Sequence, residues 1–342
     1  MRVVGCDIGG ANIKMADSDR SVRTCSFEMW SRLDQLSTVL RDMLDTFDTP
    51  DCLAVTLTAE LADCFETKSQ GVNCVLDHVA VAAGDVPVYV WQTGCEFVPS
   101  HVAREIPLLV AAANWHALAT WLGRMEPDGV ALLIDIGSTT TDIIPLCDGV
   151  PVAVGLTDRE RLQSGELVYT GTWRTPVSSI ARTVEIDGVS CPLAAEVFAT
   201  ILDVYLLLED IPENPACSQT ANRRPATRQA AVDRLLRMCC CDRTEMTDDH
   251  ALEIAKQVAE LQMEQLKTAL RRVINRQSSR PKTVLLSGSG EFLARRLVEQ
   301  VSELDGVSLT YLSQVFHPEW AEAACACAVA RLGAERLIGI EQ

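Results

Sequence analysis

The sequence has no long apolar run. Its apolar stretches, such as residues 108–113 and 130–134, are far shorter than the roughly 20 residues that cross a bilayer. The strand-like run at residues 2–7 is not preceded by a charged leader, an apolar segment and a small-residue cleavage site. We therefore expect a cytoplasmic protein with no membrane partner.

Basic residues are scarce, because 30 Lys and Arg stand against 47 Asp and Glu and give a net charge of −17. Proteins that bind nucleic acids need clustered Lys and Arg to neutralise phosphates. The composition therefore predicts no nucleic-acid partner. An anionic ligand would have to be held locally, by backbone N–H groups, a metal ion or single basic residues.

The Cys-x-x-Cys spacing of zinc sites is also missing, although the chain has 14 cysteines. The densest groups are residues 239–241 and the pair Cys325 and Cys327. We interpret them as small buried side chains on helices in a reducing compartment. The histidines are scattered without metal-binding spacing, and we assign them no role.

Length and an internal duplication both predict two lobes. At 342 residues with 48% hydrophobic residues, the chain exceeds what a single hydrophobic core usually supports. A strand-turn-strand unit that opens with Asp-Ile-Gly occurs at residues 7–9 and again at residues 135–137. Such a repeat indicates two similar α/β lobes, residues 1–128 and 129–342, around a central cleft.

The hydrophobic pattern predicts strands and helices in both halves. Strands are expected at residues 2–7, 11–17, 21–29, 52–58, 87–92, 130–136, 141–145, 282–287 and 307–312. Helices are expected at residues 32–47, 68–82, 107–125, 192–208, 228–240, 248–276, 290–302 and 319–334. Residues 192–276 thus form a helical segment in which the Pro-containing residues 211–227 are an exposed connection, and Thr247 caps the long helix.

Residues 155–190 are polar and do not fit the repeat. They include Tyr169, Gly171 and Trp173, a composition typical of loops that carry specificity. We expect an insertion that lines the cleft. The alternative is a surface excursion that binds no ligand.

The first repeated motif, CDIGGANIK, combines a carboxylate with a tight turn. Asp7 ends a strand, and Lys14 returns on the next strand. Glycines permit close approach of the backbone to a phosphate, and a carboxylate beside phosphates can hold Mg²⁺. The phosphate-binding residues predicted here are Gly9, Gly10, Ala11 and Asn12.

The second motif, DIGSTTTD, repeats this arrangement and adds hydroxyl groups. Asp135 takes the place of Asp7 and is the second expected metal ligand. The phosphate-binding residues predicted here are Gly137, Ser138, Thr139, Thr140 and Asp142. A third turn follows a buried strand and precedes a helix, where free N–H groups can hold a phosphate or a ribose. It contributes Gly288, Ser289 and Gly290.

In this order the three turns resemble the phosphate-1, phosphate-2 and adenosine motifs of the superfamily of acetate and sugar kinases, heat-shock 70 ATPases and actin. The resemblance implies two duplicated ribonuclease-H-like domains of the actin-like ATPase fold, with a helix at residues 319–334 packing at the hinge. Ser287 stands where the first glycine of the third turn is usual. This departure weakens the expectation of adenine binding more than that of phosphate binding.

Two further segments, TAELADCFETK at residues 58–68 and YTGTWRTPV at residues 169–177, resemble hydantoinase/oxoprolinase-related proteins of tetrahydromethanopterin-linked C1 transfer. That family includes a condensing enzyme of methanofuran biosynthesis. The resemblance implies a transferase that joins a furanylmethyl diphosphate to the amine of a tyramine derivative and releases diphosphate.

On this reading the cleft binds a small-molecule phosphate or diphosphate substrate. Mg²⁺ at Asp7 and Asp135, together with Lys14, would stabilise the departing diphosphate. Glu60 or Asp63 would keep the amine unprotonated. Lys68 and Arg174 are the basic residues expected in the cleft, with solvated surface charges as the alternative.

Two other functions fit the same turns. An ATP-dependent kinase or a hydantoinase/oxoprolinase-type hydrolase would hold ATP there, with ATP as a second cofactor beside Mg²⁺. A non-catalytic nucleotide-responsive protein or filament subunit is the third reading. The sequence leaves homo-oligomer formation open.

Overall fold

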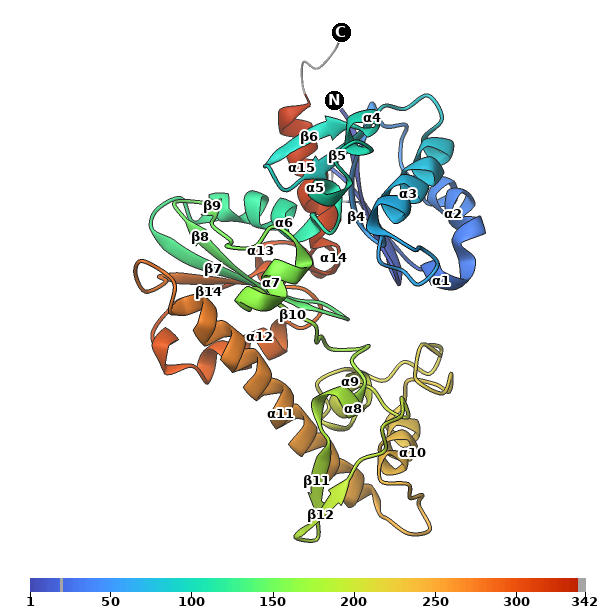
Figure 1. The fold of residues 1–342 in the computed structure, drawn as a ribbon, viewed down its shortest axis with the longest axis vertical. Helices are drawn as coiled ribbons and strands as arrows, with labels where there is room; N and C mark the ends of the chain where they lie inside the picture. Colours follow the sequence, from blue (N-terminus) through green and yellow to red (C-terminus); the bar gives the residue numbers. More distant parts are fainter. Residues whose placement is uncertain (19–20, 338–342) are drawn as a thin grey trace.

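The computed structural model describes residues 1–18 and 21–337. Figure 1 shows two lobes, each built on a β-sheet, and a separate helical body that extends from the second lobe. The long helix α11 runs from the helical body back to the second sheet (Figure 1). None of the helices in the described part of the chain has the length and apolar character needed to cross a membrane.

The first lobe is a mixed sheet in the order β3-β2-β1-β4-β5-β6. Its strands are β1 Val3–Gly9, β2 Asn12–Asp17, β3 Val22–Ser26, β4 Cys52–Thr58, β5 Val88–Gln92 and β6 Glu96–Pro99. β1 pairs antiparallel with β2 and parallel with β4. Side chains alternate along β1, so Val4 and Cys6 join the core under α2 Leu36–Leu44 and α3 Lys68–Ala83, whereas Val3 joins the core between the lobes.

The second lobe repeats this topology in the order β10-β8-β7-β13-β14. Its strands are β7 Val130–Ile136, β8 Thr141–Cys147, β9 Val150–Pro151, β10 Leu167–Val168, β13 Thr283–Ser287 and β14 Ser308–Tyr311. As in the first lobe, the central strand β7 pairs antiparallel with the next strand and parallel with a later one. Five strands of each sheet therefore have the same order and directions, which confirms the duplicated ribonuclease-H-like fold; β6 of the first sheet and β9 of the second have no counterpart.

Two helices lie between the sheets. α6 Asn114–Leu122 and α15 Ala324–Arg336 share one core with side chains of both sheets. α15 packs directly on β1, because a Cβ added at Gly5 would lie 2.2 Å from the carbonyl oxygen of Ala326. The small residues of α15 thus permit the close contact that joins the two lobes.

The helical body is formed by the segment between β10 and β13. It contains α8 Val177–Ile180, a hairpin of β11 Thr183–Ile186 and β12 Val189–Pro192, α9 Ile201–Leu207, α10 Arg228–Met238 and the start of α11 Asp248–Ile274. Thr247 caps α11, as expected, by accepting a hydrogen bond from the backbone N–H of His250. A fully buried ion pair, Arg234 to Asp203 at 2.6 Å, joins α10 to α9.

The remaining helices connect these parts. They are α1 Met29–Arg32, α4 Ser100–Ala103, α5 Pro107–Val110, α7 Asp158–Ser164, α12 Glu291–Glu299, α13 Leu312–Val315 and α14 Pro318–Glu322, with short 3-10 turns at Leu33–Gln35, Gly123–Met125 and Ser302–Leu304.

Several element predictions are wrong in detail. The helix expected at 107–125 is split into α5 and α6 by residues 111–113, where Ala112 has a positive φ of 48°. Residues 193–200 are not helical, because the chain leaves the β11–β12 hairpin and enters α9 only at Ile201. The helix expected at 319–334 is divided into α14 and α15 at Ala323. Residues 155–190 do not stand wholly outside the repeat, since β10 supplies the third strand of the second sheet.

The cysteine interpretation needs one correction. All fourteen cysteines are described and none forms a disulfide, and Cys325 and Cys327 are buried on α15 as expected. Residues 239–241 instead follow the end of α10, and Cys240 is exposed with a positive φ of 59°.

Candidate active site

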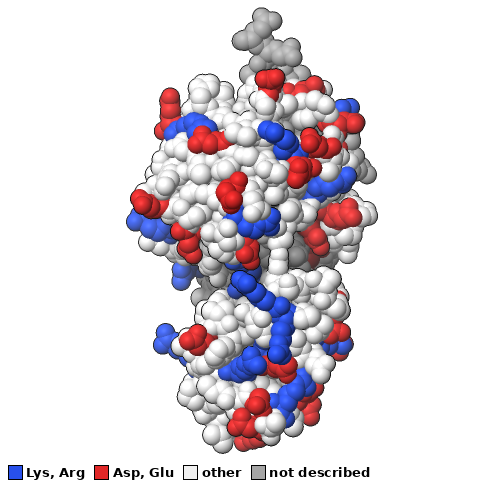
Figure 2. All heavy atoms as spheres, turned by 90° about the vertical axis from the view of Figure 1, so that its right-hand side faces the viewer, with Lys and Arg blue, Asp and Glu red and all other residues white. Residues whose placement is uncertain are grey.

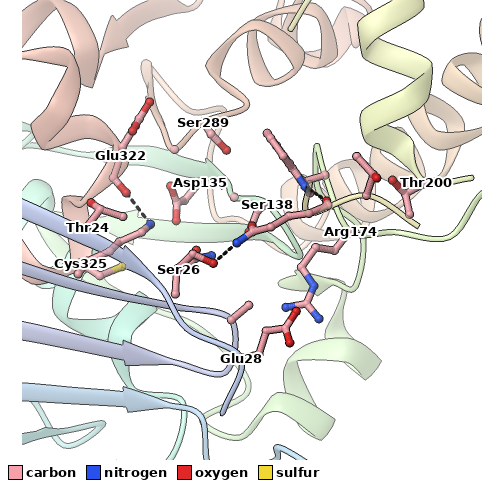
Figure 3. Close-up of a pocket in the computed structure, with 18 of the residues that line it drawn as sticks. Thr24, Ser26, Glu28, Asp135, Ser138, Arg174, Thr200, Ser289, Glu322 and Cys325 are labelled. Atoms are coloured by element: carbon pink, nitrogen blue, oxygen red, sulfur yellow. Dashed lines mark hydrogen bonds between the residues drawn. The ribbon is translucent and has the colours of Figure 1, made fainter. Parts of the chain in front are cut away.

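Two adjoining cavities lie between the lobes. The turn cavity, of about 410 Å³, is lined by Asp7, Gly9, Gly10, Glu60, Thr139 and Thr140 among others. The loop cavity, of about 620 Å³, is lined by Thr24, Ser26, Glu28, Arg223, Gly288 and Ser289 among others. They meet at residues that line both: Ala11, Asn12, Lys14, Trp30, Asp135, Gly137, Ser138, Arg174 and Cys325. Figure 3 shows Thr24 and Ser26 on the opposite side of the loop cavity from Thr200.

The structure brings most predicted site residues to these cavities. The turns that follow β1 and β7 face the same turn cavity, as do Glu60, Asp63 and Asp142. Gly290 lines neither cavity, because its backbone N–H donates to the carbonyl oxygen of Ile136 and its Cα packs on the Ile136 side chain. Lys68 also stands outside both linings, and its amine reaches Glu60 and Asp158 instead.

Both phosphate-type turns keep open space beside a glycine. A Cβ at Gly10 would meet nothing within 4 Å, and one at Gly137 would meet only the Thr140 carbonyl oxygen at 3.7 Å. The carbonyl oxygens of Gly137 and Ser138 accept hydrogen bonds from residues 172–174. Within the described chain the backbone N–H of Ser138 has no acceptor. The turns therefore offer N–H groups, rather than carbonyls, to an anion.

Two carboxylates stand at the ends of the central strands. Burial raises the pKa of Asp7 to about 6, partly offset by Lys14. Burial and the neighbouring Asp142 likewise raise the pKa of Asp135 to about 6. The Oδ1 atom of Asp7 is buried and has no hydrogen-bond partner. A buried carboxylate without a partner, as at Asp7, is stabilised by a cation.

This donor set fits Mg²⁺ bound with a phosphate. Mg²⁺ usually takes one or two protein carboxylates and completes its shell with water and phosphate oxygens. Asp7 and Asp135 could supply those carboxylates, since both line the turn cavity. Among residues 1–18 and 21–337 no group of three or more His, Cys, Asp or Glu side chains is arranged to hold a metal by itself.

Glu60 is the most buried acid of the turn cavity. Its exposed fraction is 2%, and burial raises its pKa to about 7. The backbone of Glu60 is held against α3, because a Cβ at Gly71 would lie 2.4 Å from the Glu60 carbonyl oxygen. Lys68 Nζ lies 3.9 Å from Glu60 Oε1, whereas Glu60 Oε2 has no hydrogen-bond partner. Asp63 is exposed and less suited to proton transfer.

Several contacts join the first lobe to the rest of the chain across the cleft, among them the hydrogen bond that Lys14 Nζ donates to the Glu322 carbonyl oxygen at 2.6 Å. Lys68 pairs with Asp158 of α7 at 3.5 Å. The Arg174 guanidinium lies over the Trp30 ring, 4.9 Å from its centroid. The Gln219 side-chain amide donates to the Ser26 hydroxyl (Figure 3). The two basic residues predicted for the cleft thus both bridge it.

Sequence reasoning missed Arg161 and Trp115. Arg161 is 1% exposed, donates to Asp142 Oδ1 at 2.6 Å and lies over the Trp115 ring at 3.9 Å from its centroid. Asp142 therefore pairs with Arg161 at the cavity wall, and its role is not limited to the phosphate contact predicted from the sequence. No motif marks Arg161, which lies in the short helix α7, and Trp115 lies in the first turn of the largely apolar helix α6. Neither residue could be predicted from the sequence, because the contacts that mark them form only in the folded chain.

Cys325 also lines both cavities. Burial, with smaller contributions from Asp7 and Asp135, raises the pKa of its thiol well above the ordinary value. A protonated thiol is a poor nucleophile. The site is therefore suited to substitution between two bound substrates rather than to covalent catalysis by this cysteine.

The segment at residues 169–177 supports the second turn from behind. A Cβ at Gly171 would lie 2.4 Å from the Gly137 carbonyl oxygen and 2.6 Å from the Thr139 backbone nitrogen. Thr172 and Trp173 donate backbone N–H groups to Gly137 and Ser138. A glycine is thus required at position 171, because the backbone of the second turn lies too close to admit a side chain.

We expect Gly171→Ala to lower the free energy of unfolding by about 1 to 3 kcal/mol, since backbone must move to admit the methyl group. Gly10→Ala is the matched control: its methyl meets nothing within 4 Å and points into the open turn. It should leave the melting temperature unchanged but weaken binding of magnesium diphosphate. Thermal melts with and without magnesium diphosphate measure both effects. Wild-type stability of Gly171→Ala would contradict the close approach.

Comparison with known proteins identifies relatives. The family described as Hydantoinase/oxoprolinase matches residues 51–336. A protein of Methanocaldococcus jannaschii named (4-{4-[2-(gamma-L-glutamylamino)ethyl]phenoxymethyl}furan-2-yl)methanamine synthase is 32% identical over 333 residues, 96% of this chain and 97% of its own length. A protein of the same name from Methanococcus vannielii is 28% identical over 52% of this chain and 78% of its own length. A solved structure of ROK hexokinase from Thermus thermophilus is 13% identical, covers 98% of this chain and 99% of its own, and has a TM-score of 0.45.

Proposed function

The chain belongs to the hydantoinase/oxoprolinase family, and we propose that it is a transferase that condenses a furanylmethyl diphosphate with a tyramine derivative and releases diphosphate. The product would serve the biosynthesis of methanofuran, a C1 carrier. The relative that supports this activity matches this chain over nearly its full length. The reaction needs two small molecules and no membrane or nucleic-acid partner, which suits a cytoplasmic enzyme.

The acceptor atom differs from the one expected from the sequence. The relative's name describes a phenoxymethyl ether on a furan ring, and a γ-glutamylamino group on the ethyl chain. The nitrogen of the tyramine part is therefore acylated, and the new bond is made by the phenol oxygen. We accordingly propose a phenol acceptor in place of the amine.

The observation that carries the proposal is the composition of the turn cavity. Two N–H turns, Lys14 and the carboxylates Asp7 and Asp135 surround one space, and Glu60 lines the same cavity. The first group suits a diphosphate. Glu60, with a pKa of about 7, suits removal of a proton near neutral pH.

The reaction then balances as a substitution at the furanylmethyl carbon. The bond from this carbon to diphosphate breaks, and the diphosphate leaves with the electron pair. The phenol oxygen forms the new bond and passes its proton to Glu60. Lys14 and the turn N–H groups stabilise the charge that develops on the leaving diphosphate. Mg²⁺, when held by Asp7 and Asp135, would neutralise part of the same charge.

ATP is the alternative ligand for the same turns, and ligand protection separates the two. We expect magnesium diphosphate to stabilise the protein at least as well as magnesium ATP, because an adenine contributes little to the site. A ligand at about 100 times its Kd adds roughly 2.7 kcal/mol to the free energy of unfolding. Thermal melts at matched magnesium concentration measure this effect. Strong protection by ATP with none by diphosphate would favour the kinase or hydrolase instead.

A further inference from the structure

One wall of the loop cavity is formed by a loop that hydrogen bonds hold in place. Residues 217–226, here called the rim loop, supply Ser218, Gln219, Thr220, Ala221 and Arg223 to its lining. The rim loop is closed at its base by a hydrogen bond from the Ala226 backbone N–H to the Cys217 carbonyl oxygen, at 2.9 Å. The exposed connection expected at 211–227 is therefore part of a binding cavity.

Buried groups fix the rim loop in place. Arg234, itself fully buried and paired with Asp203, donates to Asn222 Oδ1 at 3.3 Å and to the Pro225 carbonyl oxygen at 3.4 Å. The indole N–H of Trp173 donates to the Gln219 carbonyl oxygen at 3.0 Å. Since the Trp173 backbone N–H donates to Ser138, the rim loop is tied directly to the second phosphate-type turn.

Arg223 is the unusual residue of this rim. It has a positive φ of 59°, a strained conformation for arginine that is enriched at functional sites. Its side chain is exposed to the loop cavity and, among the described residues, makes no ion pair or hydrogen bond. The next residue, Arg224, pairs with Asp233 at 3.8 Å and does not line the cavity. Figure 2 shows basic side chains gathered on the helical body below the first lobe.

The charges of the two substrates indicate which substrate the Arg223 guanidinium binds. The proposed site of the diphosphate is the turn cavity, which is lined by both glycine turns and by the carboxylates of Asp7 and Asp135. The only other anionic group in the reaction is the carboxylate of the γ-glutamyl group, an amino-acid head that also carries an ammonium. Recognition of such a head needs one cation and one anion beside it.

Resting on the proposed function, we propose that the loop cavity binds the γ-glutamyl end of the acceptor, with Arg223 contacting its carboxylate and Glu28 its ammonium. Glu28 lines the same cavity as Arg223 and comes from the first lobe. The tyramine ring then reaches the junction of the two cavities beside Trp30, which lines both. At about 620 Å³ the loop cavity is large enough for a substrate of this length.

The test compares two acceptors in steady-state kinetics with a furanylmethyl diphosphate. Arg223→Gln should raise KM for γ-glutamyltyramine by about 10- to 100-fold, the range expected when a charge-assisted hydrogen bond is lost. It should leave kcat and the KM of the diphosphate substrate unchanged. KM for N-acetyltyramine, which lacks the amino-acid head, should be the same in both proteins. Arg223→Lys should recover part of the loss.

Arg224→Gln is the matched control. Arg224 is adjacent to Arg223 in the chain and is also exposed, but it pairs with Asp233 outside the cavity. It should behave as wild type with both acceptors. An equal rise in KM for γ-glutamyltyramine and N-acetyltyramine, or a rise in KM for the diphosphate substrate, would overturn the assignment.

Calorimetric titration of γ-glutamyltyramine into wild type and Arg223→Gln separates this inference from the function on which it rests. Tight binding to wild type, lost in the variant, with no condensation by either protein, would retain the subsite and remove the proposed reaction. Condensation by wild type with identical binding to both proteins would remove the subsite and retain the reaction.

Discussion

Asp7→Asn and Asp135→Asn are each expected to lower the rate of condensation by about 10²- to 10³-fold or more, the range typical for loss of a charged group that stabilises a transition state. Both carboxylates stand at the ends of central strands and line the cavity formed by the two turns. Each substitution preserves shape and removes the charge that would hold Mg²⁺ beside the diphosphate. Diphosphate release, followed with a saturating acceptor, measures the effect.

The same two substitutions should not lower the stability of the folded protein at pH 8, although they lower the rate. Because the folded-state pKa of each group is raised to about 6, ionisation costs free energy in the folded protein. This cost is absent below about pH 4, grows as pH rises towards 6 and is fully present at pH 7 to 8. Asparagine cannot ionise, so without ligand both variants should melt at the wild-type temperature or above it at pH 8, and at the wild-type temperature or below it at pH 4.

Protection by magnesium diphosphate completes this test. Wild type should gain thermal stability with the ligand, whereas both variants should gain little, since their metal-binding carboxylate is gone. Loss of cooperative unfolding in both variants would show instead that the two residues serve the fold. Full activity of either variant would remove it from the diphosphate site.

The repeated motifs made much of the fold predictable. Asp-Ile-Gly occurs twice at the end of a buried strand, and a strand-turn-strand unit has few ways to close into a sheet, so the two lobes followed from the sequence. The facing turns followed as well, because each motif lies at the same end of an equivalent central strand. The prediction at Asp7 drew on this repeated pattern, whereas the prediction at Glu60 drew on the family resemblance of residues 58–68.

The rest of the site depends on tertiary contacts that leave no local pattern. β10 has only two residues, Leu167 and Val168, and becomes a strand because β8 offers it an edge. Arg161 is recognised only when Asp142 and Trp115 surround it. Residues 217–226 read as an exposed connection because their anchor, Arg234, lies in a helix further along the chain.

Glu60→Gln is expected to lower the rate of condensation by about 10²- to 10⁴-fold, the usual contribution of a general base. The phenol oxygen attacks most readily as its proton leaves, and glutamine cannot accept that proton. Because the pKa of Glu60 is about 7, the wild-type kcat/KM should rise between pH 6 and 8 as the carboxylate ionises. In Glu60→Gln this rise should disappear.

Asp63→Asn is the control, since Asp63 lines the same cavity but is exposed. It should keep both the rate and the pH dependence of wild type. The folded state of Glu60→Gln should be at least as stable as wild type at pH 8, because burial disfavours the ionised carboxylate there. Lys68 retains Asp158 as an ion-pair partner in this variant, so the bridge between the lobes persists. A variant that keeps the rise through pH 7 would place the proton acceptor elsewhere in the cavity, and loss of activity in Asp63→Asn alone would assign it to Asp63.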